Sequence, residues 1–248
     1  MSLFQQIIKS LDSKASLEKR LVSQRFFKTG PGEYGEGDVF MGINVPDLRL
    51  VTKEYFRNAD LGVVRKLLDS KIHEHRLTGL LMLTYQFPKL LLPEKLGVYD
   101  FYLGQTSKIN NWDLVDSSAP NIVGEYMLDT KLDMEQLVQL AQSPLLWERR
   151  ISIISTLAFI RAVKKGRVGR EWLQPSLLLA KKLLTDKHDL MHKAVGWVLR
   201  EVGKADERLL IAFLDKHYLQ MPRTALRYSI ERFSEEERRK YLRKTNDH

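Results

Sequence analysis

The sequence predicts an all-α fold in which pairs of helices stack into a curved α-solenoid. From Pro46 onwards, apolar residues recur at i, i+3 and i+4 in almost every segment, which is the spacing of amphipathic helices. The breaks between these segments are short, which favours antiparallel neighbours. No segment alternates apolar and polar residues as a half-buried strand would. Short paired helices repeated along 248 residues are typical of a solenoid, although the repeats share little sequence.

The N-terminal part departs from this pattern. Amphipathic helices are expected over 3–11 and 17–27, and a loop with four glycines follows over 29–38. This loop is acidic and no Gly-Lys-Ser/Thr follows it, so it does not match a phosphate-binding P-loop. Further helices are expected at about 47–57, 61–69, 74–87, 94–107, 112–128, 133–142, 146–163, 171–184, 188–202, 205–217, 223–232 and 234–243.

The composition indicates a single soluble domain over 1–248, with N-terminal helices and the glycine-rich loop in 1–45 and helical repeats in 46–248. Hydrophobic residues make up 44% of the chain, which is enough for a sizeable core. No segment reaches the roughly 20 apolar residues of a membrane-spanning helix, and the first residues lack the pattern of a signal peptide. The lack of cysteine excludes disulfides, thiolate metal sites and a cysteine nucleophile. We therefore expect a cytoplasmic protein that does not associate with membranes.

The net charge of +9 is concentrated in the second half of the chain. Residues 125–248 carry 24 Lys and Arg against 17 Asp and Glu, whereas residues 1–124 carry 16 against 14. A basic half suggests a polyanionic partner such as nucleic acid, and a basic concave face would form a groove for it. A solvated basic surface would have the same composition, so charge alone leaves both interpretations open.

The motif WDLVD at 112–116 is the first candidate for chemistry. On a helix, Trp112 and Asp116 are four residues apart and share one face. Asp113 lies near the helix start, where its carboxylate can accept hydrogen bonds from free backbone N–H groups. Asp116 lies beyond the reach of an N-cap. It either forms a salt bridge on a core-facing helix or stays ionised beside an aromatic wall in a cleft.

Two further motifs place a tryptophan and an arginine on or beside an apolar stripe. LWERRI at 146–151 contains Trp147, which we interpret as a core aromatic, and Arg150, which is either a phosphate clamp or part of a solvated face. HKAVGWVLRE at 192–201 contains Gly196 before Trp197. Because glycine is costly inside a helix, Gly196 indicates that something comes close to it, and Trp197 is then expected to line a site.

Other polar clusters are weaker candidates. His73-Glu74-His75 and the pair His188/His192 have spacings that metal ligands use, but no third ligand is evident, and we interpret them as solvated helix faces with no metal site. The tail EEERRK at 235–240 is interpreted as a solvated helix. A basic turn either binds phosphates or is an exposed loop; it contains Lys164, Lys165, Arg167 and Arg170.

Taken in order, the motifs NWDLVD (111–116), LWERR (146–150) and KAVGWVLRE (193–201) resemble those of the AlkD-like family of DNA alkylation repair glycosylases. FFKTGPGEYGEGD at 26–38, followed by GINVP at 42–46, resembles the same family. The resemblance runs from about Phe26 to the C-terminus, and the pairing of KAVGWVLRE with WDLVD is its specific part. Some relatives lack the carboxylate and the aromatic residues and resemble binders only, whereas this sequence keeps them.

The resemblance implies an all-α superhelix of HEAT-like repeats with duplex DNA in its concave face. The implied activity is excision of positively charged N3- and N7-alkylated purines without extrusion of the damaged base, unlike most glycosylases. The implied catalytic carboxylate is Asp116, with Trp112 and Trp197 flanking the sugar and phosphate of the lesion and Arg150 contacting the backbone. Tyr34 corresponds to a tyrosine near the DNA. Further DNA-binding candidates are Trp147, Arg149, Lys193, Arg200 and, in the basic turn, Lys164, Lys165 and Arg167.

The chemistry of the residues agrees with this activity. When the cationic purine leaves as a neutral base, the positive charge passes to an oxocarbenium-like sugar. A carboxylate about 4 Å away attracts this sugar by roughly 4 kcal/mol at an effective dielectric of 20. Tryptophan faces favour a cation by about 0.5–2 kcal/mol, and no metal or other cofactor is needed. We expect a monomeric, monofunctional glycosylase acting on double-stranded DNA with alkylated purines. The alternatives are a non-catalytic binder of damaged or branched DNA and a HEAT-type protein-interaction scaffold.

Overall fold

The structure is a computed structural model that describes residues 1–131 and 134–242. Within these residues the regular elements are helices, and the one β-type pairing is an isolated bridge between Val39 and Ile72. The predicted all-α fold class is confirmed. The chain divides into two compact units, Met1–Asp129 and Thr130–His248, which are described separately below. The expected single domain over 1–248 stays a prediction.

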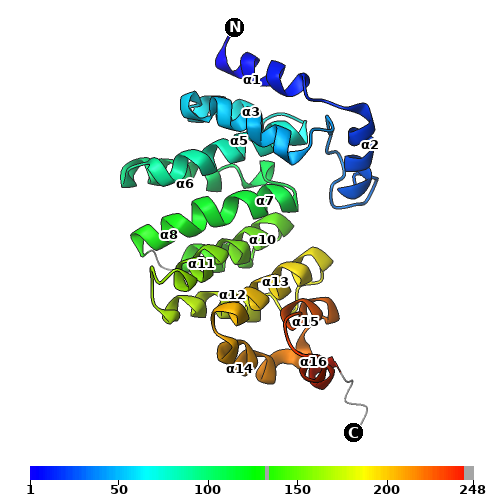
Figure 1. Cartoon of the computed structure of the whole chain (residues 1–248), viewed down its shortest axis with the longest axis vertical. Coiled ribbons are helices and arrows are strands. Elements are labelled where there is room, and N and C mark those ends of the chain that lie inside the picture. The colour runs from blue at the N-terminus through cyan, green and yellow to red at the C-terminus, as the bar shows by residue number, and fades with distance from the viewer. Residues whose placement is uncertain (132–133, 243–248) are drawn as a thin grey trace. The chain divides into compact units, whose positions relative to one another are not determined.

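The first unit is built around α5, which lies next to α3 in Figure 1. Every residue of α5 from His73 to Thr84 is buried, because α5 packs against α3, α4 and α7. Such a helix is expected in the centre of a core rather than at a surface. The helices of this part are α1 (Leu3–Asp12), α2 (Leu17–Phe26), α3 (Val45–Tyr55), α4 (Leu61–Leu68), α5 (His73–Gln86), α6 (Leu92–Leu103), α7 (Trp112–Ala119) and α8 (Glu125–Thr130). Shorter turns are η1 (Phe56–Asn58), η2 (Phe87–Lys89), η3 (Thr106–Lys108) and η4 (Pro120–Gly124).

The second unit is organised around its longest helix, α13, which packs against α10, α11, α12, α14 and α15. Its buried face follows the helical period, with Met191, Ala194, Val198 and Val202 among its buried residues. The helices here are α9 (Glu135–Ala141), α10 (Leu146–Ser155), α11 (Leu157–Lys164), α12 (Gln174–Lys182), α13 (Asp189–Ala205), α14 (Glu207–His217), α15 (Arg223–Ser229) and α16 (Glu235–Leu242), with short turns η5 (Arg170–Leu173) and η6 (Tyr218–Gln220).

Several predicted helices are interrupted, and two of the breaks follow from particular residues. The segment 146–163 is two helices, because three hydroxyl groups at the junction bond to carbonyls one turn earlier, an arrangement that bends helices; the donors are Ser152, Ser155 and Thr156. The segment 112–128 contains the π-helical turn η4, which begins at Pro120. Proline has no backbone N–H and cannot continue a regular helix. The predicted ends at 133 and 243 fall outside the described residues.

The segment that follows the glycine-rich loop is held to the core by a buried carboxylate. Glu74 of α5 accepts hydrogen bonds from the backbone N–H groups of Met41, Gly42 and Ile43, at 2.8 Å from Gly42. Gly42 has φ +82, and a Cβ there would lie 2.2 Å from the carbonyl oxygen of Ser16, just before α2. This position therefore requires glycine. Among the described residues, no helix is both long and apolar enough to cross a membrane.

Candidate functional site

The start of α7 sets the position of the WDLVD motif. Asn111 is the N-cap residue, and its Oδ1 accepts a hydrogen bond from the Trp112 N–H at 2.8 Å. The helix therefore begins at Trp112, and Asp116 lies one turn later on the same face. Both side chains are half-buried. An indole and a carboxylate of the first unit are thus displayed together, as predicted for this segment.

Trp112 belongs to an aromatic cluster at the end of α2. Its ring stacks on Phe27 with centroids 5.2 Å apart, and Phe27 in turn stacks on Phe40 at 4.9 Å. Phe26 meets Trp112 edge-on at 5.9 Å and keeps 62% of its surface exposed. The sequence alone predicts no separate role for these phenylalanines. The Phe-Phe pair directly before the glycine-rich loop is the signal that could have identified them.

The surroundings of Asp116 combine a buried phenol and a break in the helix. Tyr102 is fully buried and lies 2.9 Å from the hydroxyl of Ser118. Burial raises the pKa of Tyr102, and the negative charge of Asp116 raises it further, so the phenol stays protonated. Pro120, four residues after Asp116, has no N–H to donate to the Asp116 carbonyl, and the chain continues as a π-helical turn. Such turns are frequent at functional sites.

Asp113 has two partners. Its Oδ1 accepts a hydrogen bond from the Leu114 N–H at 2.9 Å, which confirms its predicted place at the helix start. Its Oδ2 lies 2.8 Å from Nε2 of His73, and Nδ1 of His73 lies 3.2 Å from Oδ2 of Asp38. Burial alone would lower the pKa of His73, but the charges and hydrogen bonds of Asp113 and Asp38 raise it to about 9.

Asp38 is the buried centre of this polar network. It receives Nη2 of Arg76 at 2.6 Å and the amide nitrogens of Asn110 and Asn111 at 3.3 and 3.1 Å. Burial favours the neutral form of Asp38, but the hydrogen bond from His73 and the charge of Arg76 hold the pKa of Asp38 below its usual value. The carboxylate is therefore ionised and fully satisfied inside the core.

The His73-Glu74-His75 motif does not form a solvated face, contrary to the prediction. His73, Glu74 and His75 are 1%, 3% and 6% exposed, because α5 is enclosed on all sides. Nδ1 of His75 lies 2.9 Å from the Ser70 hydroxyl. Among the described residues, no group of three or more potential ligands could hold a metal ion.

His188 and His192 are half-buried and also take part in local structure. Nδ1 of His188 accepts a hydrogen bond from the Leu190 N–H at 3.2 Å, which caps α13. Nε2 of His192 lies 2.6 Å from the carbonyl oxygen of Asp186, to which it donates. Both side chains therefore bond to the backbone at the start of α13 while they stay partly exposed, and their interpretation as a solvated face stays a prediction.

In the second unit, the arginines of LWERRI join α10 to the start of α13. Arg150 is only 4% exposed, and its Nη1 donates to the Leu190 carbonyl at 2.6 Å. The alternative that Arg150 lies on a solvated face is therefore wrong, and its role toward DNA stays a prediction. Nε of Arg149 pairs with Asp186 at 2.6 Å, and Trp147 is half-buried.

The glycine before Trp197 has a packing role. A Cβ on Gly196 would lie 2.5 Å from the Ala225 carbonyl oxygen and 2.5 Å from Cβ of Tyr228, so this glycine lets α15 approach α13. The inference from Gly196 to a site at Trp197 is therefore corrected, since helix packing explains the glycine. Trp197 itself is half-buried.

The remaining basic candidates differ in how they are held. On α13, Lys193 pairs with Asp189 at 2.7 Å, and Arg200 pairs with Glu231. In the basic turn after α11, Gly166 has φ +66, and three cationic side chains around it are exposed, namely Lys164, Lys165 and Arg167. Arg170, which is also exposed, pairs with Asp206 at 2.9 Å. In the first unit, the Tyr34 hydroxyl donates to the Phe26 carbonyl at 3.4 Å, beside the aromatic cluster.

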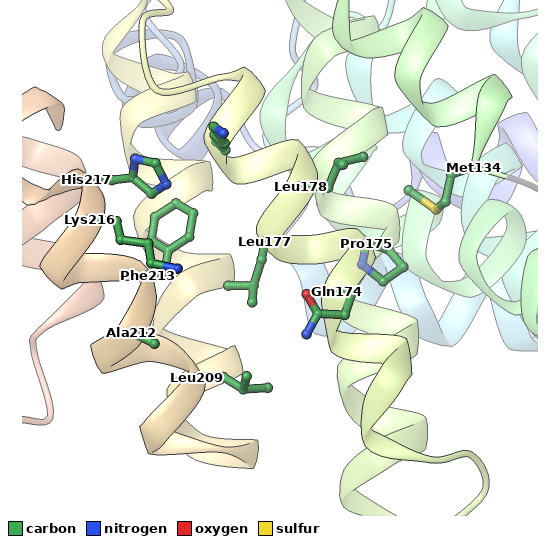
Figure 2. Close-up of a pocket in the computed structure, with 11 residues that line it drawn as sticks. Met134, Gln174, Pro175, Leu177, Leu178, Leu209, Ala212, Phe213, Lys216 and His217 are labelled. Atoms are coloured by element: carbon green, nitrogen blue, oxygen red, sulfur yellow. The ribbon is translucent and has the colours of Figure 1, made fainter.

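The second unit also contains an apolar cavity of about 660 Å³ between α12 and α14. Figure 2 shows Leu177 and Leu178 of α12 on one side and Leu209 and Phe213 of α14 on the other. Basic side chains lie near the C-terminal ends of both helices, at Lys181, Lys216 and His217. None of the site residues predicted from the sequence lines this cavity.

Comparison with known proteins decides the family. The model of the family described as DNA alkylation repair enzyme matches residues 7–233. The chain belongs to this family. A search of the curated proteins gives no match. Among solved structures, the chain is similar to one described as a predicted DNA alkylation repair enzyme from Enterococcus faecalis, with a TM-score of 0.67 and 14% identity over 90% of this chain and 98% of that one.

For this DNA alkylation repair family member, the predicted site residues fall into two sets. Trp112 and Asp116 lie on one face of α7 in the first unit, with Tyr34 next to the adjoining aromatic cluster. Trp197 and Arg150 lie in the second unit, on α13 and α10. The likeness to the enterococcal structure at 14% identity concerns the fold alone.

Proposed function

We propose that this DNA alkylation repair family member is a DNA glycosylase that hydrolyses the N-glycosidic bond of positively charged N3- and N7-alkylated purines in duplex DNA. The observation that carries the proposal is the face of α7, where the carboxylate of Asp116 lies one turn from the half-buried indole of Trp112. A cationic lesion requires a negative, aromatic environment, and this face supplies both. The resemblance of the surrounding motifs to the AlkD-like glycosylases supports the same assignment.

The mechanism follows from charge. As the neutral purine departs, positive charge develops on the sugar, and the ionised Asp116 stabilises it by roughly 4 kcal/mol at about 4 Å and an effective dielectric of 20. This corresponds to about a thousandfold in rate. The same carboxylate orients the attacking water. Trp112 contacts the lesion nucleotide through its π face, which favours a cation without requiring the base to leave the helix.

The basic second unit supplies affinity for the duplex. The exposed Lys164, Lys165 and Arg167 bind backbone phosphates, which position the protein without reading sequence. By resemblance, Trp197 and Arg150 contact the lesion-side backbone, with Trp147, Arg149, Lys193 and Arg200 as further DNA contacts. Arg150 and Arg149 are already oriented by Leu190 and Asp186, so their guanidinium groups are held before DNA binds. We propose that the protein acts as a monomer in the cytoplasm and without a cofactor.

The test is single-turnover release of N7-methylguanine and N3-methyladenine from a methylated duplex by the purified protein. Release well above the spontaneous rate, with both products detected as free bases, is the expected result. Tight binding of the same duplex without release of base would identify a non-catalytic binder instead. Failure to bind duplex DNA at all would favour a protein-interaction scaffold.

A further inference from the structure

A buried histidine and its aspartate partner, His73 and Asp38, anchor the residues on both sides of Trp112. Asn111, just before Trp112, donates its amide N–H to Oδ2 of Asp38 at 3.1 Å, and His73 Nδ1 approaches that same oxygen at 3.2 Å. Asp113, just after Trp112, accepts from Nε2 of His73 at 2.8 Å. The N-terminus of α7 is therefore held at two points by groups from α5 and the glycine-rich segment.

The charges of this network define its geometry. Both partners of the His73 ring are carboxylates, so each ring nitrogen must carry a proton to donate a hydrogen bond, and the imidazole is cationic. His73 is 1% exposed and Asp38 is 6% exposed. Charge-assisted hydrogen bonds are short and directional, and the 2.8 Å contact between His73 and Asp113 is of this kind. The contact with Asp38 lies inside the core, where water cannot replace His73. A small rotation of α7 would break the contact with Asp113.

The same histidine also supports Trp112 through a cluster of rings, in which it contacts Phe27 directly with centroids 5.1 Å apart. His73 stacks on Phe40 with centroids 4.5 Å apart, and Phe40 stacks on Phe27 at 4.9 Å. Phe27 then stacks on Trp112 at 5.2 Å. His73 therefore supports the start of α7 through the polar contact at Asp113 and supports the indole of Trp112 through Phe27. Together these contacts fix both the axial rotation of α7 and the plane of the indole.

We propose that His73 is a positioning residue that sets the Trp112–Asp116 face of α7 for excision, acting through Asp113 and through its ring contacts with Phe40 and Phe27. The inference rests on the proposed glycosylase function. It implies that losing His73 affects the chemical step more than duplex binding, because binding depends on many phosphate contacts whereas excision depends on the placement of one carboxylate. If the network only stabilised the fold, its loss would lower the excision rate and duplex binding together, in proportion to the fraction of protein that is folded.

The experiment compares His73→Gln, Asp113→Asn and the double variant with Thr78→Val as a matched control. Thr78 lies on the same helix and is fully buried, with its hydroxyl donating to the Glu74 carbonyl at 2.7 Å. Asp113→Asn keeps the size of the side chain, so it tests the proposal even if His73→Gln does not fold. Each protein is assayed well below its melting temperature for single-turnover excision, duplex Kd and amide hydrogen exchange of residues 112–116.

We expect His73→Gln and Asp113→Asn each to slow excision by about ten- to a hundredfold, with Kd changed by less than about threefold. The double variant should be no slower than the slower single variant, because both act through one contact. Exchange at 112–116 should rise more than elsewhere in α5–α8. Equal effects in Thr78→Val, or wild-type excision in Asp113→Asn, would overturn the positioning role. If the wild-type protein excises nothing, the proposed function fails, and selective exchange at 112–116 still decides the positioning of α7.

Discussion

Nε2 of His73 lies 2.8 Å from Oδ2 of Asp113, a carboxylate 40 residues further along the chain. His73 and its two carboxylate partners make the free energy of unfolding of the first unit depend on pH in both the acidic and the alkaline range. The buried histidine has a pKa raised from 6.5 to about 9, and the pKa of its second partner, Asp38, lies below 3.8. Because the two shifts have opposite signs, stability should be greatest between them.

The free energy of unfolding should therefore fall above about pH 6.5. The contribution of His73 is fully present below its unfolded pKa of 6.5 and is lost as the pH rises through about 9, which corresponds to about 3 kcal/mol. The contribution of Asp38 is present above pH 3.8 and is lost as the pH falls through its lowered folded pKa. Urea denaturation from pH 3 to 10 measures the decrease in the free energy of unfolding at both ends. The decrease above pH 6.5 should vanish in His73→Gln, and an unchanged decrease in this variant would assign it to another group.

Gly196→Ala should destabilise the second unit by about 1–3 kcal/mol. The added Cβ would lie 2.5 Å from the Ala225 carbonyl oxygen, and neither helix can yield without repacking. Gly97→Ala, in α6, is the matched control. A Cβ at Gly97 has no atom within 4 Å, so alanine should stabilise that helix by about 0.5–1 kcal/mol. Thermal unfolding of both variants measures the difference, and an equal shift in Tm would contradict the close approach of α15 to α13.

Asp116→Asn should lower the single-turnover excision rate by about two to three orders of magnitude, because it removes the charge but keeps size and hydrogen bonding. Duplex affinity should hold or improve, since a negative charge has been removed from a surface that faces phosphates. Asp69→Asn is the control, because Asp69 is an exposed carboxylate paired only loosely with Lys108 at 3.4 Å. Full activity in Asp116→Asn would remove the electrostatic mechanism.

Replacing Lys164, Lys165 and Arg167 together by Gln should weaken duplex binding for every sequence alike. If each binds one phosphate, the slope of log K against log salt should fall by about three. Lesion preference should not change, because backbone contacts carry no sequence information. The control removes the same charge from α16 at Arg238, Arg239 and Lys240, where Arg239 already pairs with Glu235. A larger effect in the control would move the phosphate contacts to α16.

The helices could be predicted because their periodicity is local. α3, α4, α5 and α13 begin and end within about three residues of the predicted positions, since apolar spacing and caps lie within each segment. The break at Thr156 was missed, because side-chain bonds to the backbone leave the apolar pattern unchanged.

The part of the candidate site on α7 could be predicted from the sequence, whereas the contacts of His73 that hold α7 in place could not. The face shared by Trp112 and Asp116 follows from their spacing alone. The partners of His73 come from the glycine-rich segment and from α7, and no short-range pattern indicates that Asp38, His73 and Asp113 meet. The two histidines of α5 were taken as solvated for the same reason, because a polar residue type favours exposure until its buried partner is known. Gly196 was misread because a single sequence shows that space is needed but not which element fills it.

α2 buries none of its ten residues, although Leu17, Leu21, Val22 and Phe26 are large and apolar. The segment after it is anchored by Glu74 and by the buried Asp38 and Phe40, whereas α2 itself has no buried residue. A helix such as α2, which buries no residue, opens at a small fraction of the free energy of global unfolding. A protease specific for basic residues will therefore cut first at Lys19, Arg20 or Arg25, at a rate set by this local opening, while the helices around α5 remain folded.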